Sequence, residues 1–164
     1  MLTGINQWAF PKDMTAEDAL KLAARLGYQS FELCVGEDGP VPLGISEAEA
    51  TALRRVADRF NIVLSTVGTG LGWQYPLTSP SPEVREKGIE VTERALQIAQ
   101  WLGTHTVLTV PGIVSPEVPY DVALENALAC VQKMVPVAEN LRVGIGVENV
   151  WNKFLLSPVE MRDF

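Results

Sequence analysis

Two glutamates are the residues best placed to carry chemistry, because each stands at the carboxyl end of an apolar run. Glu148 directly follows the run Val143–Val147, and Glu32 interrupts the run Ser30–Val35. An isolated acid in such surroundings costs several kcal/mol to desolvate unless it is paired, hydrogen-bonded or bound to a cation. A hard divalent metal is the natural partner for carboxylate oxygen. Two plainer interpretations stay open: Glu148 caps the next turn or pairs with Lys153, and Glu32 bonds a neighbouring group.

Polar and aromatic side chains lie in the segments that follow the apolar runs. Asn6 and Trp8 follow the first run, Trp73 follows the third, and Asn149 and Trp151 follow the fifth. Such groups suit a wall that contacts a sugar. Aromatic residues in loops also act as lids over the edge of a core, and this alternative stays open.

The single histidine excludes most nucleophile–base schemes. His105 lies at the start of the fourth apolar run, and no serine or cysteine has a plausible histidine partner. The two cysteines, Cys34 and Cys130, stand in apolar surroundings without a short metal-ligand spacing. We therefore expect reduced core cysteines, and neither a disulfide framework nor a zinc knuckle.

Five short apolar runs alternate with segments of helical period, which is the pattern of an α/β protein. The predicted strands are Leu2–Ile5, Ser30–Val35, Ile62–Val67, Thr106–Val110 and Val143–Val147. Three helix starts are marked by a hydroxyl that precedes an acid or a proline, at Thr15, Ser46 and Ser81. A fourth helix, about Tyr120 to Glu139, contains Pro136 and is expected to kink or stop there.

The loops indicate where a site would lie. Connections from helix to strand are very short, whereas those from strand to helix, such as Gly68–Pro80 and Pro111–Pro119, are long. Long loops at the carboxyl ends of parallel strands are where α/β proteins build their sites. Strand starts recur about every 35 residues, so eight units would need on the order of 280 residues, near the size of a barrel.

We therefore predict an α/β fold of the (β/α)8 barrel type, present here as one domain over residues 1–164 with about the first five βα units. A doubly wound open sheet is the alternative, although no G-x-G-x-x-G motif follows the first strand.

Composition narrows the class of partner. The formal net charge of −7 and the sequence pI of about 4.7 argue against nucleic acid or an anionic membrane surface. The amino terminus lacks the basic and apolar segments of a secretory signal, and no run approaches the ~20 apolar residues that cross a bilayer. We expect a cytoplasmic protein.

Two segments resemble the xylose isomerase-like superfamily. The segment Gly27–Leu33 is similar to its second strand, and Gly146–Asn149 resembles its metal-binding strand. This superfamily contains ketose 3-epimerases, sugar-phosphate isomerases and epimerases, hydroxypyruvate isomerase, inosose dehydratase and endonuclease IV. The likeness spans the whole chain in the order of its elements.

The resemblance implies a barrel with a divalent ion, commonly Mn²⁺, Mg²⁺ or Co²⁺, held by four side chains at its mouth. It assigns Glu148 as the first ligand and as one of two acid–base groups that move a proton next to a carbonyl through an enediolate. The other ligands come from later strands in the superfamily, so we expect this chain to be the front part of an enzyme and inactive alone. The expected substrate-binding residues are Asn6, Trp8, Glu32, Trp73, Asn149 and Trp151.

The expected function is metal-dependent isomerisation or epimerisation of a sugar or sugar phosphate. In the ketose 3-epimerases another glutamate follows the first ligand by a few residues; Asn152, Lys153 and Phe154 stand here, which weakens the case for a free ketose and leaves a phosphorylated sugar or another polyol open. An inosose-type dehydratase would use a similar barrel and metal but expel water. A non-catalytic alternative is a partial barrel that pairs with another chain, as a homo-oligomer or with a second part, because five strands leave an open edge.

Overall fold

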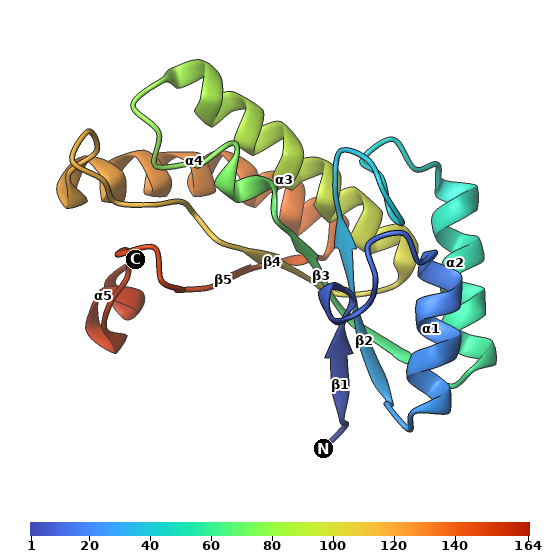
Figure 1. Ribbon diagram of the computed structural model, residues 1–164. Helices are drawn as coiled ribbons and strands as arrows, with labels where there is room; N and C mark the ends of the chain where they lie inside the picture. The colour runs from blue at the N-terminus through green and yellow to red at the C-terminus, as the bar shows by residue number, and fades with distance from the viewer.

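A parallel sheet of five strands organises the molecule (Figure 1), and the computed structural model describes all of residues 1–164. The strands are β1 (Gly4–Asn6), β2 (Ser30–Val35), β3 (Val63–Thr69), β4 (Thr106–Thr109) and β5 (Gly144–Val147). The helices are α1 (Ala16–Arg25), α2 (Glu47–Arg59), α3 (Pro82–Leu102), α4 (Tyr120–Leu141) and α5 (Pro158–Asp163), with short 3-10 turns η1 (Gln7–Ala9) and η2 (Leu71–Trp73). All five predicted strands are present, and their ends agree with the prediction to within two residues.

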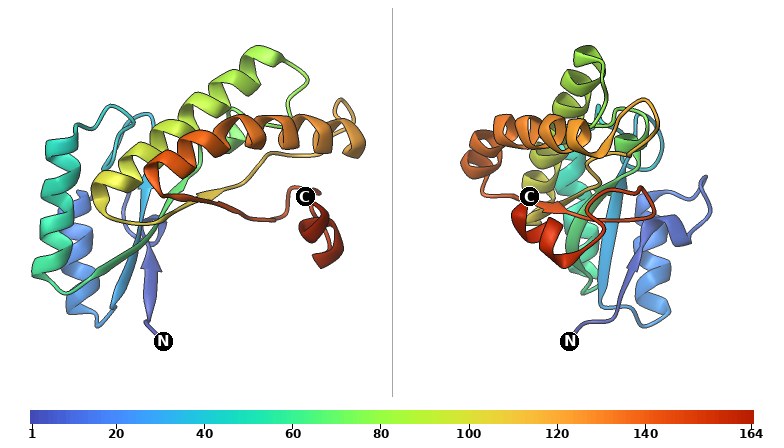
Figure 2. Two further views of the ribbon diagram at one scale, coloured as in Figure 1. Left: turned by 180° about the vertical axis from the view of Figure 1, so that it is seen from behind. Right: turned by 90° about the vertical axis from the view of Figure 1, so that its left-hand side faces the viewer.

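The order of the strands decides between the two predicted topologies. Neighbours in the sheet are consecutive in sequence, β1-β2-β3-β4-β5, and every pair is parallel. Helices α1 to α4 all lie on one side of the sheet (Figures 1 and 2). A doubly wound sheet would reverse its strand order at a switch point and carry helices on both faces. The arrangement is therefore that of successive units of a (β/α) barrel, as predicted.

The core lies between the sheet and these helices. Phe31, Leu33 and Val67 are fully buried there, and Val107 on β4 joins the same cluster. Because side chains alternate along a strand, the residues between them face the opposite side, which α1 to α4 do not cover. That inner face carries the polar groups described below.

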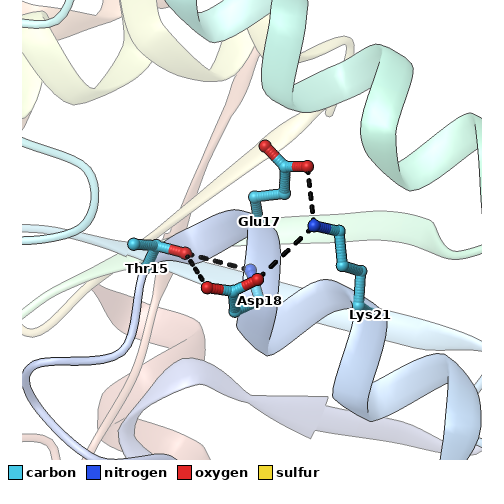
Figure 3. Close-up of polar contacts among 4 residues, drawn as sticks. All are labelled: Thr15, Glu17, Asp18 and Lys21. Atoms are coloured by element: carbon cyan, nitrogen blue, oxygen red, sulfur yellow. Dashed lines mark hydrogen bonds and ion pairs between the residues drawn. The ribbon is translucent and has the colours of Figure 1, made fainter.

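The helix starts follow the predicted signals. At the start of α1 the Thr15 hydroxyl accepts a hydrogen bond from the Asp18 backbone N–H and donates to the Asp18 carboxylate, at 3.1 and 2.9 Å (Figure 3). Lys21 reaches Glu17 at 2.8 Å and Asp18 at 3.4 Å, which ties the first turn to the second. Ser46 and Glu49 form a full capping box on α2, and Ser81 caps α3.

The predicted fourth helix is present as α4, but Pro136 does not end it. The helix continues past the proline to Leu141. Proline removes one backbone N–H, so the carbonyl of Gln132 loses its helical partner. Gln132 and Pro136 are both exposed, and water can satisfy that carbonyl. No helix in the structure combines the length and apolar character that crossing a bilayer requires.

The carboxyl end of α4 leads to a stability prediction. Arg142 terminates the helix in the left-handed conformation, at φ 57°, where a side chain with a Cβ is strained. We expect Arg142→Gly to be more stable than Arg142→Ala by about 1 kcal/mol, because both lose the charge but only glycine relieves the strain. Urea unfolding of the two variants measures the difference, and equal midpoints would contradict it.

Candidate functional site

Glu32 lies in a polar network on the inner face of the sheet. Its two carboxylate oxygens accept hydrogen bonds from the Asn6 side-chain amide on β1 and from the Thr66 hydroxyl on β3. The Glu32 side chain is half-buried, and Thr66 is its register partner on the neighbouring strand. The structure therefore places Glu32 and Asn6 together and supplies the side-chain hydrogen bonds that a buried carboxylate needs. Thr66 was not predicted, although the alternation of β3 marks it as inward-facing.

Cys34 lies beside this network on the same face of β2. Its thiol donates to the Asn6 side-chain oxygen at 3.5 Å, and its backbone N–H donates to the buried Gln7 side chain at 2.9 Å. Burial and then the negative charge of Glu32 raise the pKa of the Cys34 thiol to about 12. The thiol is therefore neutral at physiological pH and a poor nucleophile, in line with the expected core cysteine.

This shifted pKa predicts a loss of stability in alkali. The folded chain holds the Cys34 proton more tightly than the unfolded chain, where a thiol has a pKa near 8.5, so the stabilisation is complete below that pH and lost as pH rises toward 12. We expect the free energy of unfolding to fall by up to about 1.4 kcal/mol per pH unit above pH ~9 from this group. Urea unfolding of the wild type and of Cys34→Ala should converge as pH rises; parallel pH profiles would contradict it.

A cleft of about 620 Å³ opens at the carboxyl ends of β1, β2 and β3. Trp8, Phe10 and Lys12 line it from the first loop, Asp38 from the second, and Gly70 from the third. Trp8 is exposed and its ring lies next to Gly70, so it forms part of the cleft wall. The combination of an aromatic wall with a few charged groups is typical of small-molecule sites.

The loops after β3 and β5 meet through two tryptophans. The rings of Trp73 and Trp151 stack with their centroids 5.2 Å apart and an angle of 26° between their planes. Trp151 nevertheless keeps 82% of its surface exposed, and Trp73 keeps 42%. The pair is thus an aromatic surface at the mouth and does not cover the core. Asn149, in the same β5 loop, is exposed.

Glu148 stands at the carboxyl end of β5. Its backbone N–H donates to the carbonyl of Thr109 at 3.0 Å, so the residue still belongs to the sheet ladder. Ile145 and Val147 pack against the core, and alternation therefore places Gly146 and Glu148 on the inner face. The Glu148 side chain is exposed and forms no ion pair with Lys153.

The residues present do not complete a metal site. No three His, Cys, Asp or Glu side chains gather closely enough to hold an ion. Glu148 has free carboxylate oxygens at the end of β5, whereas Glu32 has both oxygens occupied by hydrogen bonds. His105 is exposed just before β4, at the opposite end of the sheet. One carboxylate does not fit the coordination that a divalent ion requires.

Asn152 is a residue whose place the sequence did not reveal. It is fully buried although it lies in the loop after β5, and its amide donates to the carbonyl of Gly112 in the loop after β4. Phe154 is also fully buried, between Tyr120 of α4 and the carboxyl-terminal Phe164. Neither was distinguishable from ordinary loop residues, because their burial depends on packing against distant segments.

Comparison with known proteins supports this description of the fold. SgbU of Haemophilus influenzae, provisionally named an L-ribulose-5-phosphate 3-epimerase, is 24% identical over 156 residues, which cover 94% of this chain and 54% of that protein. The crystal structure of D-psicose 3-epimerase with D-tagatose from Clostridium cellulolyticum H10 superposes with a TM-score of 0.80 at 19% identity, over 99% of this chain and 58% of that one. A D-psicose 3-epimerase in the presence of D-fructose gives 0.78 at 21%, over 95% and 55%.

The chain thus spans about half the length of each of these proteins. At such identities the structural likeness concerns the fold. The sequence profile of one family, described as the xylose isomerase-like TIM barrel, matches residues 20–164, which is most of the chain. With this match and the sequential parallel sheet, the chain belongs to the xylose isomerase-like TIM barrel family.

Proposed function

We propose that this chain is the part of a sugar or sugar-phosphate isomerase or epimerase that supplies Glu148 as an acid–base group. The observation that carries the proposal is a free carboxylate at the carboxyl end of β5, on the inner face of the sheet. The epimerases among its relatives support the class of reaction. Family membership and the stacked Trp73 and Trp151 rings at the carboxyl ends of the strands support a carbohydrate substrate.

The reaction needs a base beside an acidic carbon. The Glu148 carboxylate would take the proton from the carbon next to the sugar carbonyl, while the C–H electron pair forms a C=C bond and the carbonyl oxygen gains the displaced pair. Return of a proton from a second acid–base group to the opposite face of that carbon re-forms the carbonyl and gives the epimer. Return of the proton to the former carbonyl carbon gives the isomer, provided that the hydroxyl proton of the first carbon passes to the enediolate oxygen so that the new carbonyl forms there. No water is gained or lost. Such proton transfer by a positioned carboxylate contributes typically 10²–10⁴-fold.

The aromatic and polar groups at the carboxyl ends of the strands suit a polyol. Trp73 and Trp151 present an exposed stacked surface on which the C–H face of a sugar can lie. The cleft at the ends of β1 to β3 adds Trp8 and the cation of Lys12. A phosphorylated sugar fits this mixture because its phosphate can pair with a lysine. Glu32, Asn6 and Asn149 complete the proposed set of substrate-binding residues.

On this proposal, activity also depends on further metal ligands. Glu148 would be one ligand of a divalent metal such as Mn²⁺, Mg²⁺ or Co²⁺, and other ligands would have to come from another segment or chain, because no three His, Cys, Asp or Glu side chains gather closely enough to hold an ion. We therefore expect this chain alone to be inactive.

The test is deuterium exchange followed by NMR. L-ribulose 5-phosphate, D-fructose and D-psicose are each incubated in D₂O with Mn²⁺, with this chain alone and with any longer form that its gene encodes. The proposal expects deuterium at the carbon next to the carbonyl, with the epimer or isomer as product, only in the longer form. Loss of water from a polyol would instead indicate a dehydratase, and no exchange in any form would overturn the proposal.

A non-catalytic role is the second candidate, and the largely uncovered inner face favours it. Helices α1 to α4 leave that side of the sheet open, and only the short α5 lies there, near the end of β5 (Figures 1 and 2). A partial barrel of this kind would assemble with another chain. Sedimentation decides this: a well-folded monomer at high concentration would count against it.

A further inference from the structure

The loop that follows Glu148 is held in a strained conformation. Lys153 and Leu155 have φ angles of 58° and 55°, in the left-handed region that residues with a Cβ avoid at a cost of roughly 1–2 kcal/mol each. Such strain persists only where the surroundings determine the backbone, and it is concentrated at functional sites. Phe154 and Leu155 are buried beneath the loop, while Trp151 and Lys153 stay exposed.

The Asn152 side chain is the polar centre of this loop. Its amide donates to the Gly112 carbonyl at 2.6 Å, and its side-chain oxygen accepts from the backbone N–H groups of Val150 and Phe154 at 3.4 Å each. Its backbone carbonyl accepts from Val114 at 3.1 Å. Only a side chain with both a donor and an acceptor satisfies these partners, and Asn152 is completely buried.

The contacts of Gly112, to which Asn152 donates, also include the loop after β3. Gly112 lies against Thr78, whose hydroxyl donates to the carbonyl of Ile113 and accepts from the Ile113 backbone N–H at 3.0 and 3.1 Å. The loops after β3, β4 and β5 are thus joined through Thr78, Gly112 and Asn152. The loop after β3 carries Trp73, and the loop after β5 carries Trp151.

We propose that Asn152 is a positioning residue, which fixes the segment between Glu148 and Trp151 and so sets the carboxylate beside the tryptophan pair. Glu148 is held at one end of this segment by its bond to Thr109, and Asn152 holds the other end through Gly112. Without the hydrogen bond from Asn152 to Gly112, the loop is no longer fixed and Trp151 can separate from Trp73. The inference rests on the proposed function only in that Glu148 is given an acid–base role.

The experiment uses the tryptophan pair as a reporter on this chain. Two stacked indoles couple through their transition dipoles and give paired bands of opposite sign in the circular dichroism spectrum. Of the four tryptophans, Trp73 and Trp151 are the two whose rings stack. The Trp73→Phe variant lacks one of these indoles, so its circular dichroism spectrum is the reference for a chain without the stacked pair. Thermal unfolding, followed in the same samples, reports on the fold as a whole.

Asn152→Asp is the decisive variant because its donor depends on pH. At about pH 8 the buried carboxylate would face the Gly112 carbonyl without a proton to donate. The pair of opposite circular dichroism bands, called the couplet below, should then fall to the level of Trp73→Phe. At about pH 5 the acid, whose pKa burial raises, is protonated and donates again, so the couplet should return. Wild type and the exposed Asn140→Asp control should show the full couplet at both pH values.

A second variant covers the case in which Asn152→Asp unfolds at the higher pH. Asn152→Ser is too short to reach Gly112, and it should fold but lack the couplet at both pH values. A couplet that persists in the folded aspartate or serine variant overturns the inference. So does loss of the whole fold in both variants. Neither result bears on deuterium exchange, so this inference and the proposed function fail separately.

Discussion

A Glu148→Gln variant of the active form should exchange deuterium at least about 10³-fold more slowly than wild type, with KM changed only a few-fold. Glutamine keeps the size and hydrogen-bonding reach of the side chain but cannot accept the proton. Because the Glu148 side chain is exposed and pairs with no other group, the free energy of unfolding should change by less than about 0.5 kcal/mol. The two readouts together separate a catalytic role from a structural one.

The matched control is Glu139→Gln, an exposed acid on α4 that forms no side-chain hydrogen bond. It should leave exchange and stability as in wild type. Equal rates for Glu148→Gln and wild type would remove Glu148 from the mechanism. The same variant also tests the proposed metal ligand: calorimetric binding of Mn²⁺ to the active form should weaken when Glu148 is replaced.

Phe154→Ala should destabilise the chain by about 3–5 kcal/mol, the largest effect we expect on the fold. The ring is fully buried and packs against Tyr120 and Phe164, with centroids 5.5 and 5.9 Å away. Truncation leaves a cavity beneath the loop that carries Trp151. The urea midpoint should fall by more than about 1 M.

The control for this variant lies on α5. Val159 is 56% exposed, so Val159→Ala should shift the urea midpoint little. Phe154→Leu, which keeps most of the volume, should cost clearly less than Phe154→Ala. A cost for Phe154→Ala below about 1 kcal/mol would show that the aromatic cluster forms too little of the core to hold the loop.

Local signals in the sequence were sufficient for the elements and their order. The hydroxyls of Thr15, Ser46 and Ser81 marked three helix starts because capping involves residues only three positions apart. Short apolar runs located all five strands, since a parallel strand is buried on both faces. Of the two outcomes predicted at Pro136, a stop does not occur, because solvent can satisfy the carbonyl that the proline frees and the local rule does not include solvent.

The candidate site was predictable only in part. The position of Glu148 at a strand end followed from the apolar run before it, whereas the exposure of its side chain did not. The partners of Glu32 did not follow, because Asn6 and Thr66 lie 26 and 34 residues away and meet it only through strand pairing. The catalytic and substrate-binding roles of these residues stay predictions.

The sequence by itself determined the βα units, the helix caps, the acid at the end of the fifth strand and the likeness to the xylose isomerase-like barrels, since each depends on neighbouring residues. Tertiary structure alone decided that Trp73 stacks on Trp151 and that Asn152 is buried against Gly112. The physical reason is distance along the chain: these contacts join loops that come together only after the parallel sheet has brought the carboxyl ends of its strands to one edge.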